Sequence, residues 1–230
     1  MLESLKQQVF AANQRIVRSG LVTGTFGNVS GIDHERGLVV IKPSGVAYEV
    51  MTAANMVVVS VETGEVAGGT LRPSSDTPTH LALYRAFSGI GGIVHTHSLF
   101  ATAWAQAQRE IPVLGSTHAD YFDGPVPCTR QMTPEEIERD YELNTGLVIV
   151  ERLAGLDPGD FPAVLVANHG PFCWGESPDQ AVDHAIYTEF IARLASETVA
   201  VNPEASQIQD ALLRKHFRRK HGPAAYYGQG

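Results

Sequence analysis

The chain begins with apolar residues at the three- and four-residue spacing of one helix face, namely Leu2, Leu5, Val9, Ala12 and Ile16. This spacing predicts an amphipathic helix, and Gly20 stands where a helix C-cap would fall. The apolar runs 38–42 and 56–61 are short and bounded by polar residues, which favours strands. Between the second run and a further short strand, Glu-Thr-Gly-Glu at 62–65 predicts a turn.

Helical and strand-like segments alternate irregularly along the rest of the chain. The same signals predict strands over 92–97 and 163–167, and helices over 77–87, 99–108 and 209–220. The segments 133–136 and 177–180 each place a hydroxyl before a proline and an acid or amide three residues on. Both therefore predict a helix start with a capping box.

The order of these elements predicts the fold class. Strict β-α alternation, which is typical of a doubly wound parallel sheet, is absent from the pattern. We therefore expect an α/β protein, a three-layer sandwich with a mostly antiparallel central β-sheet flanked by helices. The length of 230 residues and the lack of a convincing linker favour a single domain over 1–230.

Composition narrows the class of protein. The formal net charge is -8, whereas nucleic-acid binders usually carry a basic face. The two cysteines, Cys128 and Cys173, lie far apart and predict small buried thiols rather than a disulfide framework or a redox pair. No apolar run approaches the roughly 20 residues that cross a bilayer, and no signal peptide is recognised. The expectation is a soluble cytoplasmic protein.

The chemistry that stands out is a group of histidines at strand ends. His95 and His97 end the predicted strand 92–97, and residues two apart on a strand point to the same side. His169 follows another apolar strand, at a glycine-flanked turn. Neutral imidazole is a preferred zinc ligand, and a catalytic zinc site leaves one position open. The alternative is that these are surface or capped histidines.

An acidic residue near the predicted helix 77–87 is a fourth candidate ligand. Asp76 directly precedes this helix, so its simplest role is that of an N-cap. Capping does not exclude ligation if one carboxylate oxygen remains free. His80 lies one turn into the helix and is interpreted as a packing residue or an outer partner of the metal site.

Three loops combine small residues with hydrogen-bond donors, at 24–28, 42–45 and 73–76. Hydroxyls, glycine amides and a helix N-terminus together form a usual anion cradle, which indicates a phosphate site. Pro-Ser-Gly is also ordinary turn chemistry, so each loop alone is open to that explanation.

Two further segments carry ionisable groups. His118 and Asp120 lie in an otherwise uncharged stretch and could serve as proton donor and acceptor, or could belong to a solvated loop. The basic run 214–221 complements the dipole at a helix C-terminus. Aromatic residues are unusual so close to a chain end, so Tyr226 and Tyr227 suggest that the C-terminal tail, which contains them, packs against another surface.

Read together, seven blocks in order resemble the class II aldolase family, which acts on sugar phosphates. They are GTFGNVS at 24–30, KPSG at 42–45, PSSDTPTH at 73–80, GGIVHTHS at 91–98, STHADYF at 116–122, NHGPFCWG at 168–175 and KHGPAAYYGQ at 220–229. The resemblance implies that His95, His97 and His169 ligate Zn²⁺, or Mn²⁺ or Co²⁺, with Asp76 completing the set. It implies substrate contacts from Gly27, Asn28, Ser44, Gly45, Ser74, Ser75, His216 and Arg219.

The resemblance also implies how the chemistry is divided between chains. Asp120 would be one acid/base, and Tyr227 from a neighbouring subunit the other, in a homotetramer with active sites at subunit interfaces. Asp76, where related aldolases typically have Glu, favours the epimerase branch, which interconverts L-ribulose 5-phosphate and D-xylulose 5-phosphate by breaking and remaking the C3–C4 bond.

Other branches of the family remain as alternatives. An aldolase that releases its aldehyde uses the same metal chemistry, and the Ala167-Asn168 pair before His169 is common among aldolases. A methylthioribulose phosphate dehydratase is a more distant possibility and should lack the Tyr-Tyr block. A binding module like the adducin head is the non-enzymatic alternative.

Overall fold

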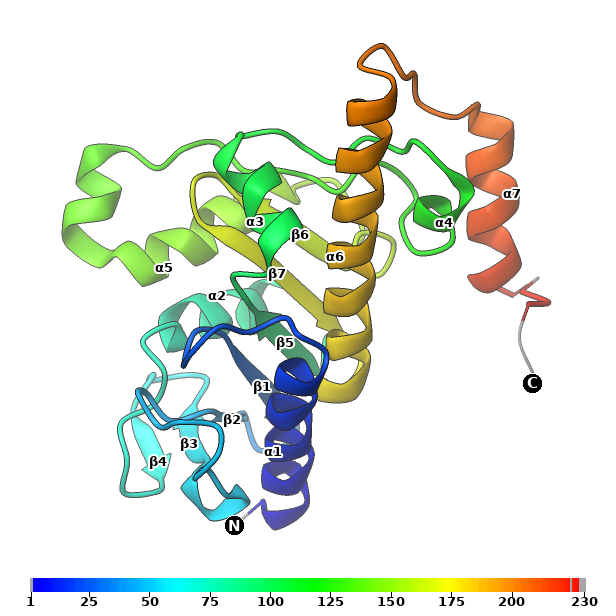
Figure 1. The fold of residues 1–230 in the computed structure, drawn as a ribbon. Coiled ribbons are helices and arrows are strands. Elements are labelled where there is room, and N and C mark those ends of the chain that lie inside the picture. Colours follow the sequence, from blue (N-terminus) through cyan, green and yellow to red (C-terminus); the bar gives the residue numbers. More distant parts are fainter. Residues whose placement is uncertain (1, 224, 228–230) are drawn as a thin grey trace.

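Antiparallel strands form a sheet in the order β4-β3-β2-β1-β5-β7-β6 in the computed structural model, which describes residues 2–223 and 225–227 (Figure 1). The strands are β1 (Asn28–Asp33), β2 (Leu38–Ile41), β3 (Val57–Ser60), β4 (Val66–Gly68), β5 (Gly92–His95), β6 (Ala163–Val166) and β7 (Gly170–Gly175). Each neighbouring pair runs antiparallel. This arrangement confirms the predicted antiparallel sheet.

Helices cover both faces of the sheet. They are α1 (Glu3–Arg18), α2 (Thr77–Ala86), α3 (Leu99–Gln106), α4 (Ser116–Ala119), α5 (Pro134–Arg152), α6 (Pro178–Val201) and α7 (Asp210–Lys220), with a 3-10 turn at Ala53–Asn55. The predicted helices are thus present to within one or two residues at most ends. The short helix α4 was not predicted, because four residues carry no periodic pattern.

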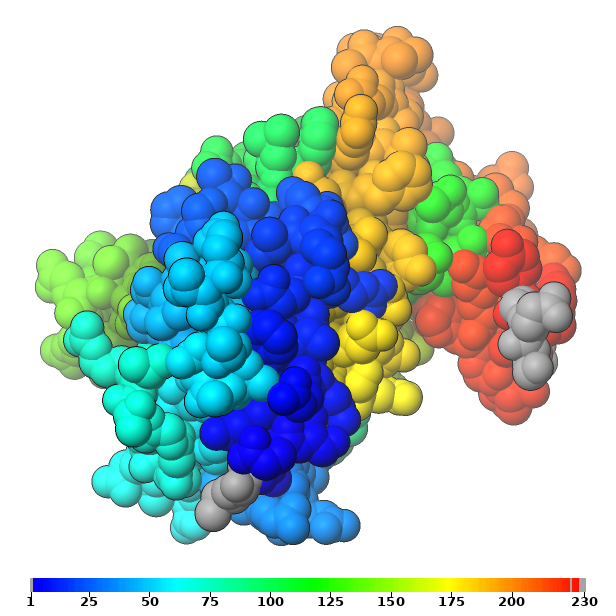
Figure 2. All heavy atoms as spheres, turned by 60° about the horizontal axis from the view of Figure 1, so that its bottom comes forward, coloured from blue at the N-terminus to red at the C-terminus, as the bar shows by residue number. Residues whose placement is uncertain are grey.

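Alternation along the strands explains the three layers. In β2, Val40 packs in one apolar cluster with α1, α3 and α6, whereas Val39 and Ile41 pack in a second cluster with α2 and α5. Successive side chains of a strand point to opposite faces, so a strand that is apolar throughout needs cover on both sides. The predicted three-layer sandwich is confirmed. Figure 2 shows α1 and α6 side by side on one outer face.

The predicted capping boxes differ in outcome. At α5, the Thr133 hydroxyl accepts from the backbone N–H of Glu136, whose carboxylate accepts in return from the N–H of Thr133. At α6, the Ser177 hydroxyl accepts from the N–H of Gln180, but the Gln180 side chain accepts from Glu176 instead. The helix starts where predicted in both cases, although the second box is not reciprocal.

Strands β1 and β7 were not predicted as strands. Glycine and polar residues interrupt the apolar pattern of β1, and two glycines and a proline interrupt that of β7. In β1, Gly31 lies under the start of α6, where a Cβ would come within 2.8 Å of Pro178 Cγ. Strands β1 and β7 therefore resemble loops in the sequence, because close packing requires small residues there.

The two cysteines are free, with Cys173 buried and Cys128 half-buried. Within the described residues, no helix combines the length and the apolar character that crossing a membrane requires.

Candidate metal centre and substrate site

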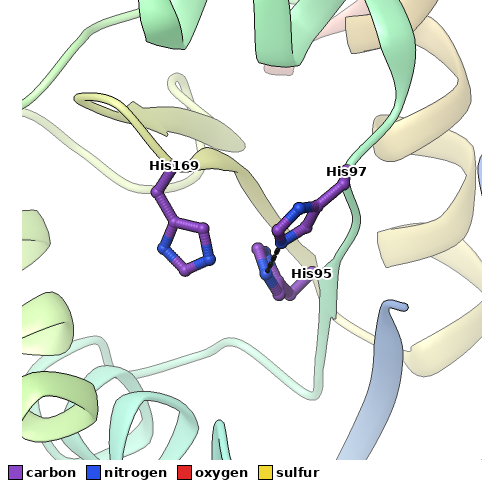
Figure 3. A group of neighbouring side chains, drawn as sticks. All are labelled: His95, His97 and His169. Atoms are coloured by element: carbon purple, nitrogen blue, oxygen red, sulfur yellow. Dashed lines mark hydrogen bonds between the residues drawn. The ribbon is translucent and has the colours of Figure 1, made fainter. Parts of the chain in front are cut away.

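Three histidines from two parts of the sheet meet at one end of it. His95 ends β5, His97 follows two residues later, and His169 lies in the turn between β6 and β7. One nitrogen of each ring lies within 4.8 Å of the others, and Nε2 of His95 is 3.1 Å from Nε2 of His97. Figure 3 shows His169 facing the other two rings from the opposite side. The predicted juxtaposition is therefore present in the structure.

The predicted reason for the His95–His97 pairing is wrong in one respect. The strand was expected to reach His97, but β5 ends at His95. The chain then turns into α3, whose first backbone amides, those of Phe100 and Ala101, donate to the carboxylate of Glu189 on α6. His97 is thus placed by the turn before α3 rather than by strand alternation.

Each imidazole has its own orienting contact. His95 donates from Nδ1 to the carbonyl of Pro171 at 3.0 Å, and its ring stacks on Phe172 with centroids 4.1 Å apart. The ring of His97 stacks on Phe26, with centroids 5.7 Å apart. His169 has Nδ1 at 3.4 Å from the hydroxyl of Tyr141. His95 therefore offers the unprotonated Nε2 toward the centre of the cluster.

Desolvation keeps this cluster neutral. Burial lowers the pKa of His95 to about 3, with a further lowering from His97. Burial likewise lowers the pKa of His169 to about 3, and the other two histidines add to the effect. The pKa of His97 is lowered by desolvation as well. Neutral imidazoles whose lone pairs converge are the form that ligates a divalent cation, so this donor set fits such an ion.

Asp76 lies beside the three histidines, but its carboxylate oxygens are outside the close cluster of candidate ligand atoms. It is the N-cap residue of α2, yet its side chain makes no capping hydrogen bond. The amide of Asn28 donates instead to Asp76 Oδ2 at 2.5 Å. Asp76 lines the same cavity as the three histidines, although the close cluster of candidate ligand atoms comprises the histidines alone among the described residues. The N-cap alternative is therefore wrong for the side chain.

The three donor-rich loops do meet at the histidines. A cavity of about 320 Å³ is lined by residues 25–28, 42–45 and 74–76 together with the histidines. It includes the predicted substrate residues Gly27, Asn28, Ser44, Gly45, Ser74 and Ser75. Two backbone hydrogen bonds join the second and third loops, from Ser44 to Arg72 and from Ser74 to Lys42. The first loop approaches β5 so closely that a Cβ at Gly27 would lie 2.9 Å from the carbonyl oxygen of His95.

Lys42 was not identified from the sequence as a buried cation that lines this cavity. Lys42 is 2% exposed, and its ammonium lies 4.8 Å from the centroid of the Tyr48 ring. Burial lowers the pKa of Lys42, while the negative charge of Asp76 opposes this. Lys42 was part of the KPSG motif, but the loop was interpreted only through its hydroxyl and its amides. A lysine that ends a wholly apolar strand was the available signal.

His80 is buried behind the site, where it packs rather than lines the cavity. Its Nδ1 lies 2.7 Å from the Ser30 hydroxyl, which lies 2.9 Å from the hydroxyl of Tyr84. Burial lowers the pKa of His80 to about 3, and Asp76 opposes this.

The predicted acid/base residues, Asp120 and Tyr227, lie near each other but away from the histidine cavity. Arg219 on α7 donates two hydrogen bonds to the Asp120 carboxylate, at 2.9 and 2.7 Å, and His216 Nδ1 lies 3.0 Å from it. The Tyr227 ring lies 4.4 Å from the Arg219 guanidinium. None of these four residues lines the histidine cavity. Figure 1 shows α4 and α7 together on the far side of α6 from α5. Gly228 and Gln229, which end the last motif, lie outside the described residues.

The environment of Asp120 favours its ionised form. Burial raises the pKa of Asp120, but the hydrogen bonds from Arg219 and His216 and the nearby charge of Lys220 outweigh it, so the pKa is lowered. Within one chain, Asp120 is therefore a carboxylate held by cations.

The metal-free protein is expected to lose stability as the pH falls below 6.5. Burial lowers the pKa of His80 and His95 to about 3 and that of His118 to about 4. Histidines in the unfolded chain have a pKa near 6.5, so between pH 6.5 and 4 only the unfolded chain binds these protons. Each histidine then removes about 1.4 kcal/mol of unfolding free energy per pH unit. Urea unfolding at pH 7, 6 and 5 measures this slope, and pH-independent midpoints would contradict it.

Comparison with known proteins places the chain among related sequences. The family model described as Class II Aldolase and Adducin N-terminal domain matches residues 7–196. L-ribulose-5-phosphate 4-epimerase UlaF of Salmonella paratyphi B (strain ATCC BAA-1250 / SPB7) is 57% identical over 228 residues, which is 99% of this chain and 100% of the relative. The protein of the same name from Salmonella typhi has the same identity and coverage. Among solved structures, an L-fuculose 1-phosphate aldolase superposes with a TM-score of 0.78 at 24% identity, covering 93% of this chain and 94% of that one.

Proposed function

Because the chain belongs to the class II aldolase family, we propose that it is an L-ribulose-5-phosphate 4-epimerase that interconverts L-ribulose 5-phosphate and D-xylulose 5-phosphate. The observation that carries the proposal is a single cavity in which a neutral histidine cluster adjoins three donor-rich loops. The full-length identity to relatives of that name supports the choice of substrate. In this proposal residues 1–230 form one catalytic domain, which works in the cytoplasm.

The division of roles follows from the chemistry of each residue. His95, His97 and His169 would hold a divalent ion, zinc in this proposal, and Asp76 would be a fourth ligand. When bound, the ion supplies Lewis-acid polarisation of the substrate's carbonyl oxygen. Manganese and cobalt suit the same imidazole donors.

The loops suit the phosphate end of the substrate. The residues that line the cavity beside the histidines offer backbone amides, an amide side chain and hydroxyls, namely Gly27, Asn28, Ser44, Gly45, Ser74 and Ser75. Lys42 adds a positive charge in a protein whose net charge is negative. A desolvated cation beside amide and hydroxyl donors is typical of an anion site.

The reaction inverts C4 by a retro-aldol and aldol sequence. A base takes the C4 hydroxyl proton, the C3–C4 bond breaks with its electron pair left on the three-carbon fragment, and glycolaldehyde phosphate is released within the site. After the aldehyde turns over, the bond reforms on its other face and a second group protonates the C4 oxygen. Inversion requires acid/base groups on opposite faces of C4. We assign them to Asp120 and to Tyr227 of a neighbouring subunit, in a homotetramer with active sites at subunit interfaces. His216 and Arg219 contact the substrate in the same pocket in this proposal.

The assay that tests this function follows two products at once. Zinc-loaded protein is incubated with L-ribulose 5-phosphate while D-xylulose 5-phosphate and free glycolaldehyde phosphate are measured. Xylulose phosphate without accumulating aldehyde, lost on chelation and restored by zinc, is expected. Accumulating aldehyde would assign the protein to the aldolases instead. A protein that takes up no metal and converts nothing would match a binding module like the adducin head.

The length of the side chain at position 76 is expected to set the balance between the two reactions. Asp76→Glu adds one methylene, which lets the carboxylate reach past the position where Asn28 holds it. We expect aldehyde release to rise relative to epimerisation, because a longer carboxylate can act as a base on the substrate. The ratio of free glycolaldehyde phosphate to xylulose phosphate measures this. Asp76→Asn, which keeps the length, should lower both products, and an unchanged ratio in Asp76→Glu would refute the explanation.

A further inference from the structure

The ring of His169 has a hydrogen-bond partner that belongs to neither the sheet nor the loops of the cavity. Its Nδ1 lies 3.4 Å from the hydroxyl of Tyr141, with ring centroids 6.0 Å apart. Figure 3 shows one ring nitrogen of His169 facing the other two histidines and the other facing away from them. Tyr141 therefore contacts the nitrogen that does not face the cluster.

We propose that Tyr141 is a positioning residue that holds His169 in its metal-ligating orientation. The inference rests on the proposed metal site, which it deepens. A histidine that ligates through one nitrogen usually donates its other N–H to an oxygen acceptor, which sets the tautomer and the ring orientation. Here the phenol oxygen of Tyr141 accepts from Nδ1–H, and the Nε2 lone pair of His169 is left toward the metal.

The local structure of α5 delivers Tyr141 to this position. The helix is interrupted at Asp140, whose φ of -141° and ψ of 65° are not helical. The residues after the break are held in place, since the Thr145 hydroxyl donates to the carbonyl of Tyr141 at 2.8 Å. The Thr79 hydroxyl on α2 donates to the carbonyl of Glu142. The break thus directs Tyr141 toward the β6–β7 turn while its backbone stays fixed to α2.

Tight contact between α5 and α2 makes this support rigid. A Cβ at Gly146 would lie 2.6 Å from Cβ of Ala82, so the glycine allows the two helices to approach closely. Helix α2 begins directly after Asp76. One helix pair therefore carries both the candidate carboxylate ligand and the residue that orients His169.

His169 needs this support more than His95 does. The Nδ1 of His95 is held by a backbone carbonyl, that of Pro171, and its ring is buried against Phe172. His169 is only partly buried and lies in a turn whose preceding residue, Asn168, has a positive φ of 63°. The hydrogen bond from another element adds a directional restraint to a ring that also packs against His95 and Phe172.

The test is a Co²⁺ titration of the metal-free full-length protein, followed by visible absorption, which reports ligand geometry. Tyr141→Phe keeps the ring and removes the acceptor, and it is expected to weaken Co²⁺ binding about 10- to 100-fold and to change the absorption band. The thermal midpoint of the metal-free variant should stay near that of the wild type, which separates positioning from a general loss of stability. Tyr187→Phe is the matched control, because it removes a phenol whose ring stacks on Tyr121.

Three outcomes can be told apart. Weakened Co²⁺ binding in Tyr141→Phe alone supports the inference. Equal affinity and an unchanged band in wild type and Tyr141→Phe would overturn it while leaving the metal site and the proposed function standing. A wild-type protein that binds no Co²⁺, Mn²⁺ or Zn²⁺ would overturn both.

Discussion

A His97→Asn variant is expected to lose about a thousandfold of the epimerase kcat while keeping the wild-type fold. The side chain is exposed and stacks on Phe26, so its replacement opens no cavity in the core. It nevertheless removes one of the three nitrogens that meet at the proposed metal. Lewis-acid stabilisation of this kind is worth several kcal/mol, and about 4 kcal/mol corresponds to three orders of magnitude in rate.

The measurement pairs kcat with bound metal per chain, determined by elemental analysis after dialysis. Loss of both, with an unchanged circular dichroism spectrum, is the expected result. His34→Asn serves as the matched control, because His34 hydrogen-bonds the carbonyl of Ile90 and lines a different groove. A His97→Asn protein that retains full activity without metal would show that the histidines serve another purpose.

Local patterns in the sequence predicted most of the architecture. The apolar runs at β2 and β3 and the periodic face of α1 are signals that a short window contains in full. Two strands near the site are harder, because β1 carries glycine and polar side chains and β7 carries glycines and a proline. These two strands were therefore not visible in the sequence, whereas β5, which ends at His95, was predicted.

The sequence predicted the histidine cluster, but only one of the two reasons for that prediction was correct. Its residues follow apolar strands, and strand ends of one sheet tend to meet at a common rim. The assumption that His97 continues the strand was wrong, since the chain leaves β5 at His95. The position of His97 depends instead on how α3 begins, and Glu189, some ninety residues later, caps that helix.

Long-range contacts explain what the sequence did not reveal. Asp76 was expected to cap its helix, to ligate the metal or to do both, but its carboxylate accepts a hydrogen bond from Asn28, 48 residues earlier. Asp120 was recognised as an ionisable group, yet its ion pairs with Arg219 and His216 span nearly a hundred residues. Lys42 and Tyr141 were missed because their significance lies in burial and in one distant contact. No local pattern encodes such pairings before the fold brings the partners together.

The tail is expected to contribute the second acid/base group. Tyr227→Phe removes the hydroxyl and keeps the ring that covers Arg219, so the tail should stay docked. We expect kcat to fall about 10²- to 10⁴-fold, which is the usual contribution of a positioned proton donor. Metal content and thermal midpoint should remain those of the wild type, in contrast to His97→Asn. A variant with wild-type kcat would remove Tyr227 from the mechanism.

Mixed assemblies then decide which chain supplies the tyrosine. His97→Asn and Tyr227→Phe chains are co-expressed with different tags and purified through both. In the proposed homotetramer, each chain of such a mixture lacks one half of the machinery. If each site takes its histidines from one chain and its tyrosine from a neighbour, the doubly purified mixture regains about 29% of wild-type activity, because one site in four pairs two intact halves and the two tags remove the inactive homotetramers. If each chain uses its own tyrosine, every site is defective and nothing is restored. Recovery is the expected result, since within one chain Tyr227 lies over Arg219 beside Asp120 and does not line the histidine cavity.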